Sequence, residues 1–282
     1  MRNTLLSTIA SFGIASAVAI PARAQAPEVN EKEPDALGLH AELGLHSAYV
    51  WRGLNLFADT DVEGRLDQSD QNLMLAPSLA YMLPGTNLSV GYWGAFQLTG
   101  DHRGALVDAG VGAEQDLFAF WELSLDASTS LELGATYYFY PFAEEEQAGV
   151  DFPHMLEPTI IASHSLDWVD VGLTVAYFHA FTSELEAGRH VYINPAVERE
   201  TALTSAMGLG LSAGFGYKIW TGDHGDDDSN TYDVLVGVAA PVALGSSLSV
   251  SPGVSWAWTN FEGRGFGDEH VVFGSLVVGA EG

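Results

Sequence analysis

The stretch LGLHAELGLHSAYVW, residues 37–51, alternates between two kinds of side chain along its whole length. Its odd positions are mostly apolar, whereas its even positions are polar or small and include His40, Glu42 and His46. A period of two is typical of a β-strand with one apolar and one polar face. Strands of globular proteins usually run about 5 to 6 residues, while a tilted strand that crosses a membrane needs about 9 to 11. The stretch therefore predicts a transmembrane strand.

The same period recurs through the rest of the chain, and the connections between the predicted strands alternate in length. Short turns at residues 84–87, 127–130, 165–167, 198–200 and about 241 alternate with connections over 53–71, 99–116, 141–153, 182–189, 221–230 and 259–269. In bacterial outer-membrane barrels the strand number is even, short turns face the periplasm and long loops face outward. The sequence thus predicts an all-β fold, an antiparallel up-and-down transmembrane β-barrel of about twelve strands. These are expected at 37–51, 73–83, 88–98, 117–126, 131–140, 155–164, 168–181, 190–197, 203–219, 231–239, 247–258 and 270–279.

The N-terminal residues precede this pattern. Arg2 is followed by an apolar run over 5–20 and by small residues at 22, 24 and 26, which predicts a signal peptide over 1–26. Residues 27–36 hold four acids and two prolines without an apolar period, so we expect a flexible leader there. The barrel would then occupy 37–282, exported by the Sec pathway to the outer membrane of a Gram-negative bacterium.

Composition narrows the classes of partner and chemistry. The formal net charge of −27 disfavours nucleic acid as a partner. The absence of cysteine excludes disulfides, thiolate metal sites and a cysteine nucleophile. The expected partners are outer-membrane lipid, lipopolysaccharide, the barrel assembly machinery and a small molecule or ion that permeates.

Two features bear on the strands themselves. Pro77, Pro158, Pro195 and Pro252 fall inside predicted strands, and proline there normally marks an edge or a bulge. Because a closed barrel has no edge, we expect bulges or bends that shift the assignment of faces beyond each proline. Aromatic residues near strand ends predict girdles at the membrane interfaces, and these are Tyr49, Trp51, residues 137–140, Trp168, Trp220, Trp256 and Trp258.

Three segments resemble a known group of proteins. They are Ser47-Ala48-Tyr49-Val50-Trp51-Arg52-Gly53, Asp108-Ala109-Gly110, and the pattern from Tyr232-Asp233-Val234 through Ser251-Pro252-Gly253-Val254-Ser255-Trp256. In these the chain is similar to the TorF-family porins, bacterial outer-membrane barrels of poorly defined substrate. The resemblance implies an outer-membrane barrel with a pore role, and it supplies no catalytic residues.

The predicted lumen carries more acid than base. Acidic side chains there lower the energy of cations in a pore, so the channel is expected to prefer cations. The alternative is that these charges pair across a narrow bore and fill it. The candidate pore-lining residues are His40, Glu42, His46, Arg52, Glu122, Asp126, Glu132, Glu157, Asp170, Lys218 and Asp233.

Evidence for a cofactor is weaker. Asp223, Asp226 and Asp228 offer loop carboxylates that could bind Ca²⁺ or Mg²⁺, with a solvated loop as the plain alternative. An EF-hand is excluded, because Thr231 stands at the glycine position and Gly237 at the glutamate position.

Our leading hypothesis is a porin-like channel for passive diffusion of small solutes, with no enzymatic activity. Two alternatives stay open. One is an outer-membrane barrel hydrolase that cleaves lipid or peptide, for which His102, His179 and His190 lie near strand ends without a matched nucleophile. The other is a structural barrel whose acidic loops bind cations. The sequence from Gly210 to Gly214 imitates a nucleophile elbow, but it lies within unbroken alternation and fits a stripe of small residues facing the lumen.

Overall fold

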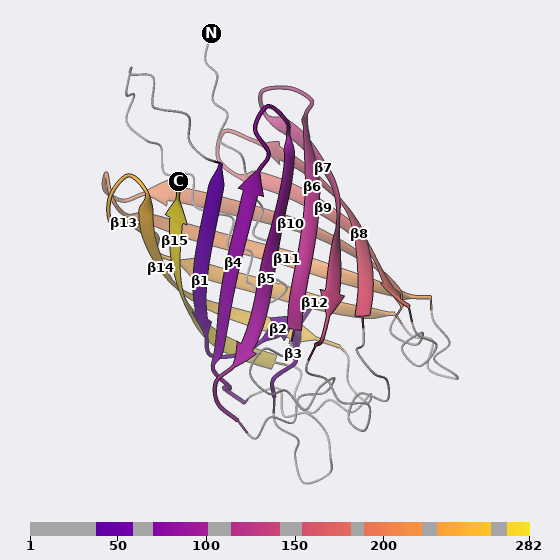
Figure 1. The fold of residues 1–282 in the computed structure, drawn as a ribbon. Helices are drawn as coiled ribbons and strands as arrows, with labels where there is room; N and C mark the ends of the chain where they lie inside the picture. Colours follow the sequence, from indigo (N-terminus) through magenta and orange to yellow (C-terminus); the bar gives the residue numbers. More distant parts are fainter. Residues whose placement is uncertain are drawn as a thin grey trace.

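The computed structural model describes residues 38–58, 70–100, 114–141, 154–181, 189–221, 230–260 and 270–282. In this part of the chain every regular element is a strand, and no helix is long and apolar enough to cross a membrane. Twelve long strands pair antiparallel in chain order, and pairing of the first with the last closes the barrel (Figure 1). The predicted closed barrel of twelve strands is confirmed. The strands are β1 (Leu39–His46), β4 (Met74–Met82), β5 (Leu88–Gln97), β6 (Glu114–Ser124), β7 (Thr129–Phe139), β8 (His154–Ser165), β9 (Asp170–Ala180), β10 (His190–Ala202), β11 (Gly208–Trp220), β12 (Thr231–Ala239), β14 (Leu248–Thr259) and β15 (His270–Glu281).

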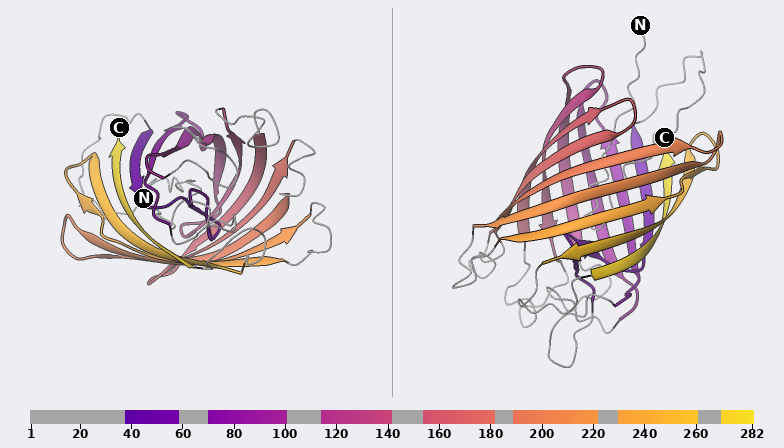
Figure 2. Two further views of the ribbon diagram at one scale, coloured as in Figure 1. Left: turned by 90° about the horizontal axis from the view of Figure 1, so that it is seen from below. Right: turned by 180° about the vertical axis from the view of Figure 1, so that it is seen from behind.

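Three short strands complete the set. β13 (Val242–Ala243) extends the turn that leads into β14. β2 (Val50–Trp51) and β3 (Leu54–Asn55) form a separate hairpin that leaves the wall and lies inside the ring of strands (Figure 2). The expected strand over 37–51 is therefore too long, because its membrane-spanning part ends at His46. The chain reverses at Arg52 and Gly53, whose φ angles are 49° and 83°.

The turn between β10 and β11 also differs from expectation. Glu198, Arg199 and Glu200 were predicted to form it, but they lie within β10 and pair with β11. The chain turns instead at residues 203–207, where the Leu203 N–H donates to the Met207 carbonyl at 2.9 Å. The Thr204 hydroxyl also accepts the Met207 N–H at 3.0 Å. Three consecutive charged residues are typical of a turn. Here Glu198 and Glu200 face the lumen and Arg199 faces outward, which the sequence alone does not show.

The expected bulges at the four strand prolines are absent. The β7–β8 ladder, for example, keeps one register from Thr129 opposite His164, through Ala135 opposite Pro158, to Phe139 opposite His154. At Pro77, Pro158 and Pro195 the ladder on one side skips two residues, but the pairs before and after keep the same register. All four point away from the lumen, as do the apolar residues that alternate with them. The assignment of faces therefore continues unchanged past Pro77, Pro158, Pro195 and Pro252.

The outer face of the wall is apolar, with Leu43, Leu117 and Val272 at 47%, 51% and 58% exposure. Aromatic pairs lie on it near the long-loop end, such as Tyr137 with His154 and Tyr217 with Tyr232. The predicted girdle is only partly correct. Trp168, Trp256 and Trp258 face outward, but Tyr49, Trp51, Tyr138, Tyr140 and Trp220 pack inside the barrel.

Candidate functional site

The hairpin lies inside the barrel and is buried there. All of residues 48–58 are buried or half-buried, and the Leu56 N–H donates to the Tyr49 carbonyl at 2.7 Å. Val50 packs with Phe273 of β15, whereas Trp51 lies 5.3 Å from the ring of Phe178 on β9. The hairpin thus contacts strands on both sides of the lumen.

The turn of the hairpin also fits closely against the wall. A Cβ atom on Gly53 would lie 2.7 Å from the Asp233 Cβ and 3.0 Å from the Thr259 Cβ, on β12 and β14. Glycine is required here both by this approach and by the positive φ angle.

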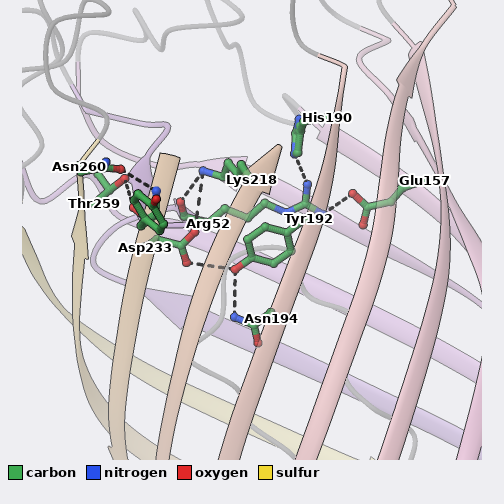
Figure 3. A network of polar contacts seen from close by, with 10 residues as sticks. Arg52, Glu157, His190, Tyr192, Asn194, Lys218, Asp233, Thr259 and Asn260 are labelled. Carbon is green, nitrogen blue, oxygen red and sulfur yellow. Dashed lines mark hydrogen bonds and ion pairs between the residues drawn. The ribbon is translucent and has the colours of Figure 1, made fainter. Parts of the chain in front are cut away.

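Arg52, at the turn of the hairpin, is the centre of a polar network (Figure 3). Its guanidinium donates to the Glu157 carboxylate of β8 and contacts the Nε2 atom of His190 on β10. The guanidinium carbon also lies 4.6 Å from the Trp51 ring centroid and 4.2 Å from that of Tyr192, within the range of cation–π attraction. Arg52 therefore joins the hairpin to two strands of the wall.

A second cation extends the network toward β12. Lys218 donates from Nζ to the Arg52 carbonyl at 2.8 Å and lies 4.0 Å from the Asp233 carboxylate. The Tyr192 hydroxyl donates to Asp233 Oδ1 at 3.0 Å and accepts from Asn194 Nδ2 at 3.1 Å. These contacts fix the backbone of the hairpin turn as well as its side chain.

Three inward acids come from β6 and β8, namely Glu114, Asp116 and Glu157. Glu114 accepts hydrogen bonds from the Tyr49 hydroxyl at 2.8 Å and the Tyr140 hydroxyl at 2.7 Å. Glu157, besides its pairing with Arg52, accepts from the Tyr138 hydroxyl at 3.1 Å. Asp116 is completely buried, and its carboxyl group is hydrogen-bonded to that of Glu114.

Sequence reasoning missed Glu114 and Asp116 because it assigned them to the loop over 99–116. The signal was present, since both continue the even-numbered inward face of Phe118, Phe120 and Glu122.

Most of the candidate pore-lining residues lie on the inward side of the barrel, although their role in a pore stays a prediction. Glu122 and Glu132 lie opposite each other on β6 and β7, in the half nearer the short turns. Asp170 is exposed at the start of β9, opposite Glu198. On the inward side of the described wall and hairpin, Arg52 and Lys218 are the only lysine or arginine side chains. The wall residues that point inward are His40, Glu42, His46, Glu122, Glu132, Glu157, Asp170, Lys218 and Asp233.

Asp126 does not belong to the lumen. It lies exposed in the turn between β6 and β7, where its carboxylate accepts the Ser128 N–H at 2.8 Å. That backbone hydrogen bond and those from the Thr129 and Ser128 hydroxyls lower its pKa from 3.8 to about 2. Strong local bonding of this kind identifies Asp126 as a turn-forming residue.

The remaining candidates are the possible metal ligands and the histidines considered for a hydrolase. Asp223, Asp226, Asp228 and His102 lie outside the described residues. His40 is 3.1 Å from the Glu42 carboxylate, but no described group of three acidic or histidine side chains is arranged to hold a metal. His179 faces outward against Phe181, and His190 contacts Arg52. Neither histidine is placed beside a serine by the described contacts.

Comparison with known proteins supports the fold. No family model and no curated protein matches the sequence. The COG4313 outer membrane channel from Pseudomonas putida F1 is similar in structure, with a TM-score of 0.56 and 14% identity over 91% of this chain and 99% of that one. A NanC porin structure gives 0.49 and 8% identity over 86% of this chain and 98% of that one. At 14% identity the likeness to the COG4313 channel shows the fold alone, that of an outer-membrane β-barrel.

Proposed function

We propose that the protein is a narrow, passive channel of a Gram-negative outer membrane that prefers small cations. The observation that carries the proposal is the uneven charge of the barrel interior. Arg52 and Lys218 are the only inward lysine or arginine residues in the described part of the chain, and both belong to the hairpin network. Carboxylates that line a pore attract cations and repel anions.

The hairpin makes the proposed channel narrow. Twelve strands enclose a modest bore, and a buried hairpin that contacts both sides leaves less of it for solutes. The segment with the clearest resemblance to TorF-family porins, Ser47–Gly53, leads into and forms much of this hairpin. Membership of that family is part of the proposal, as are export by the Sec pathway and contact with lipopolysaccharide.

The inward acids nearer the short turns support the cation preference most directly. Glu122 faces Glu132, and Glu198 and Glu200 each have a buried carboxyl oxygen without a described hydrogen-bond partner. These groups are not compensated by a described base on the inward face. They favour a cation channel over a lumen filled by paired charges.

Planar-bilayer recording of the refolded protein tests the proposal. Under a KCl gradient we expect small, steady conductance steps and a reversal potential on the side that indicates potassium permeation. A preparation that folds but gives no channels would refute the pore, and a chloride-preferring channel would refute the assigned selectivity.

A further inference from the structure

The bore is tightest beside the hairpin. At this level, buried inward side chains come from six different strands, and they are Met74, Gln97, Tyr138, Glu157, Lys218 and Phe273. Nearer the short turns, inward side chains such as those of Glu42, Glu122 and Glu198 keep exposed surface. The position of the hairpin therefore decides how wide the proposed channel is.

The hairpin is held to the wall in two different ways. Its arms pack in apolar clusters, in which Leu56 and Phe57 meet aromatic rings of β6 and β7. Its turn is held by polar contacts, from the Arg52 guanidinium to Glu157 and His190 and from Lys218 to the Arg52 carbonyl (Figure 3). Only the polar contacts depend on protonation, so the turn is the part of the hairpin that can respond to pH.

His190 is the member of this network whose residue type changes charge between about pH 5 and 8. Its Nε2 atom contacts the Arg52 guanidinium. Because a guanidinium group only donates hydrogen bonds, Nε2 must accept, and the imidazole is neutral in this arrangement. The ring is 1% exposed and its centroid lies 5.2 Å from that of Phe178 and 5.0 Å from that of Trp220. A proton on Nε2 would break the contact and place a second cation against Arg52 in a site that water does not reach.

The groups around His190 are already engaged with one another. The described charged or titratable ones are Arg52 of the hairpin, Tyr138 of β7, Glu157 of β8, Tyr192 of β10, Lys218 of β11 and Asp233 of β12. The neighbouring strand β9 contributes only the uncharged ring of Phe178. With a proton on His190, three cations would face the two carboxyl groups of this network. Movement of Arg52 away from His190 relieves that excess of positive charge.

We propose that the hairpin turn is an acid-sensitive gate, in which a proton taken up by His190 releases Arg52 and widens the constriction. The inference rests on the proposed channel and adds regulation to it. Because opening takes up one proton, the ratio of open to seated turns should rise by up to about tenfold for each unit by which the pH falls.

A cysteine placed beneath the turn reports its movement without recourse to conductance. Thr259 is buried on β14, and a Cβ atom on Gly53 would lie 3.0 Å from its Cβ, so the seated turn covers this position. The chain contains no cysteine, and Thr259→Cys is therefore the single reactive thiol. We measure its reaction rate with a charged, water-soluble thiol reagent in the refolded protein. Division by the rate at Glu198→Cys, which faces the lumen away from the hairpin, corrects for the pH dependence of the thiol itself.

We expect this rate ratio to rise about tenfold or more between about pH 7.5 and about pH 5.5. The rise should vanish in His190→Gln, which still offers a neutral oxygen to the guanidinium but takes up no proton. It should persist in the matched control His179→Gln, because His179 faces outward on β9. His190→Asn also offers a neutral oxygen and replaces His190→Gln if that variant does not refold.

The possible results separate the gate from the proposed function. A rise that requires His190 supports the gate even if no channel is recorded, in which case only the proposed function fails. A rate ratio that does not change with pH overturns the gate, whether or not the protein conducts. A rise that survives in His190→Gln also overturns it, and assigns the response to Glu157 or Asp233 instead.

Discussion

Arg52 has three separate roles in the hairpin. Its left-handed backbone conformation turns the hairpin, its carbonyl receives Lys218, and its guanidinium pairs with Glu157. A buried pair of this kind does not by itself imply large stabilisation, because both ions lose hydration. It does specify position, because Glu157, His190 and Lys218 contact Arg52 from three different strands of the wall. Arg52 thus sets where the hairpin lies in the bore.

We expect Arg52→Met to loosen the hairpin while retaining most of the side-chain volume. It leaves Glu157 buried without its cation, which costs about 3–5 kcal/mol of unfolding free energy in comparable sites. Conductance and cation preference should both rise, because the constriction relaxes and a carboxylate is released. Urea unfolding and bilayer recording measure the two effects. Arg199→Met, which removes an exposed outward arginine, is the control, and identical behaviour of the two variants would contradict the role of Arg52.

At the scale of elements, periodicity predicted the wall well because one physical requirement acts on every strand. A membrane-spanning strand must present apolar side chains to lipid at alternate positions, and the wall strands follow this rule. The rule cannot show where a strand leaves the wall. Tyr49 and Trp51 keep the alternation of β1, yet they pack against the inside of the barrel, where aromatic surface is equally well buried. Glu114 and Asp116 were missed for the related reason that acids were taken to indicate a loop.

The position of Glu198 in β10 gives a test at this scale. Because the chain contains no cysteine, single substitutions can be labelled without background. In lipid vesicles Glu198→Cys should react with a charged, water-soluble thiol reagent, since its side chain faces the lumen. Val197→Cys should be protected, because residue 197 faces outward with 46% exposure and would contact lipid. Equal and rapid labelling at both positions would instead place a solvated turn there, as the sequence alone suggested.

At the scale of the whole molecule, charge and apolar surface are separated by the barrel wall. A chain with a net charge of −27 and 47% hydrophobic residues can do this because lipid covers the outer face while water and the hairpin cover the inner one. The inward Arg52 and Lys218 both lie at the hairpin, whereas Glu122, Glu132, Glu198 and Glu200, nearer the short turns, have no described lysine or arginine beside them. Two contributions to ion selection should therefore act in series, a diffuse one from these acids and a local one at the constriction beside the hairpin.

Salt concentration separates these two contributions. The Debye length falls from about 10 Å at 0.1 M to about 3 Å at 1 M, so the diffuse attraction of Glu122, Glu132, Glu198 and Glu200 should be largely screened in concentrated salt. Charges buried at the constriction beside the hairpin are screened much less. We expect the potassium preference, measured from reversal potentials at a fixed tenfold KCl gradient, to fall between dilute and concentrated salt but to keep a residual part. The double variant Glu122→Gln/Glu132→Gln should lower the dilute-salt value and leave the residual part intact. A preference that does not change with salt would show that the diffuse acids contribute nothing, and one that disappears entirely would leave no role in ion selection for the constriction beside the hairpin.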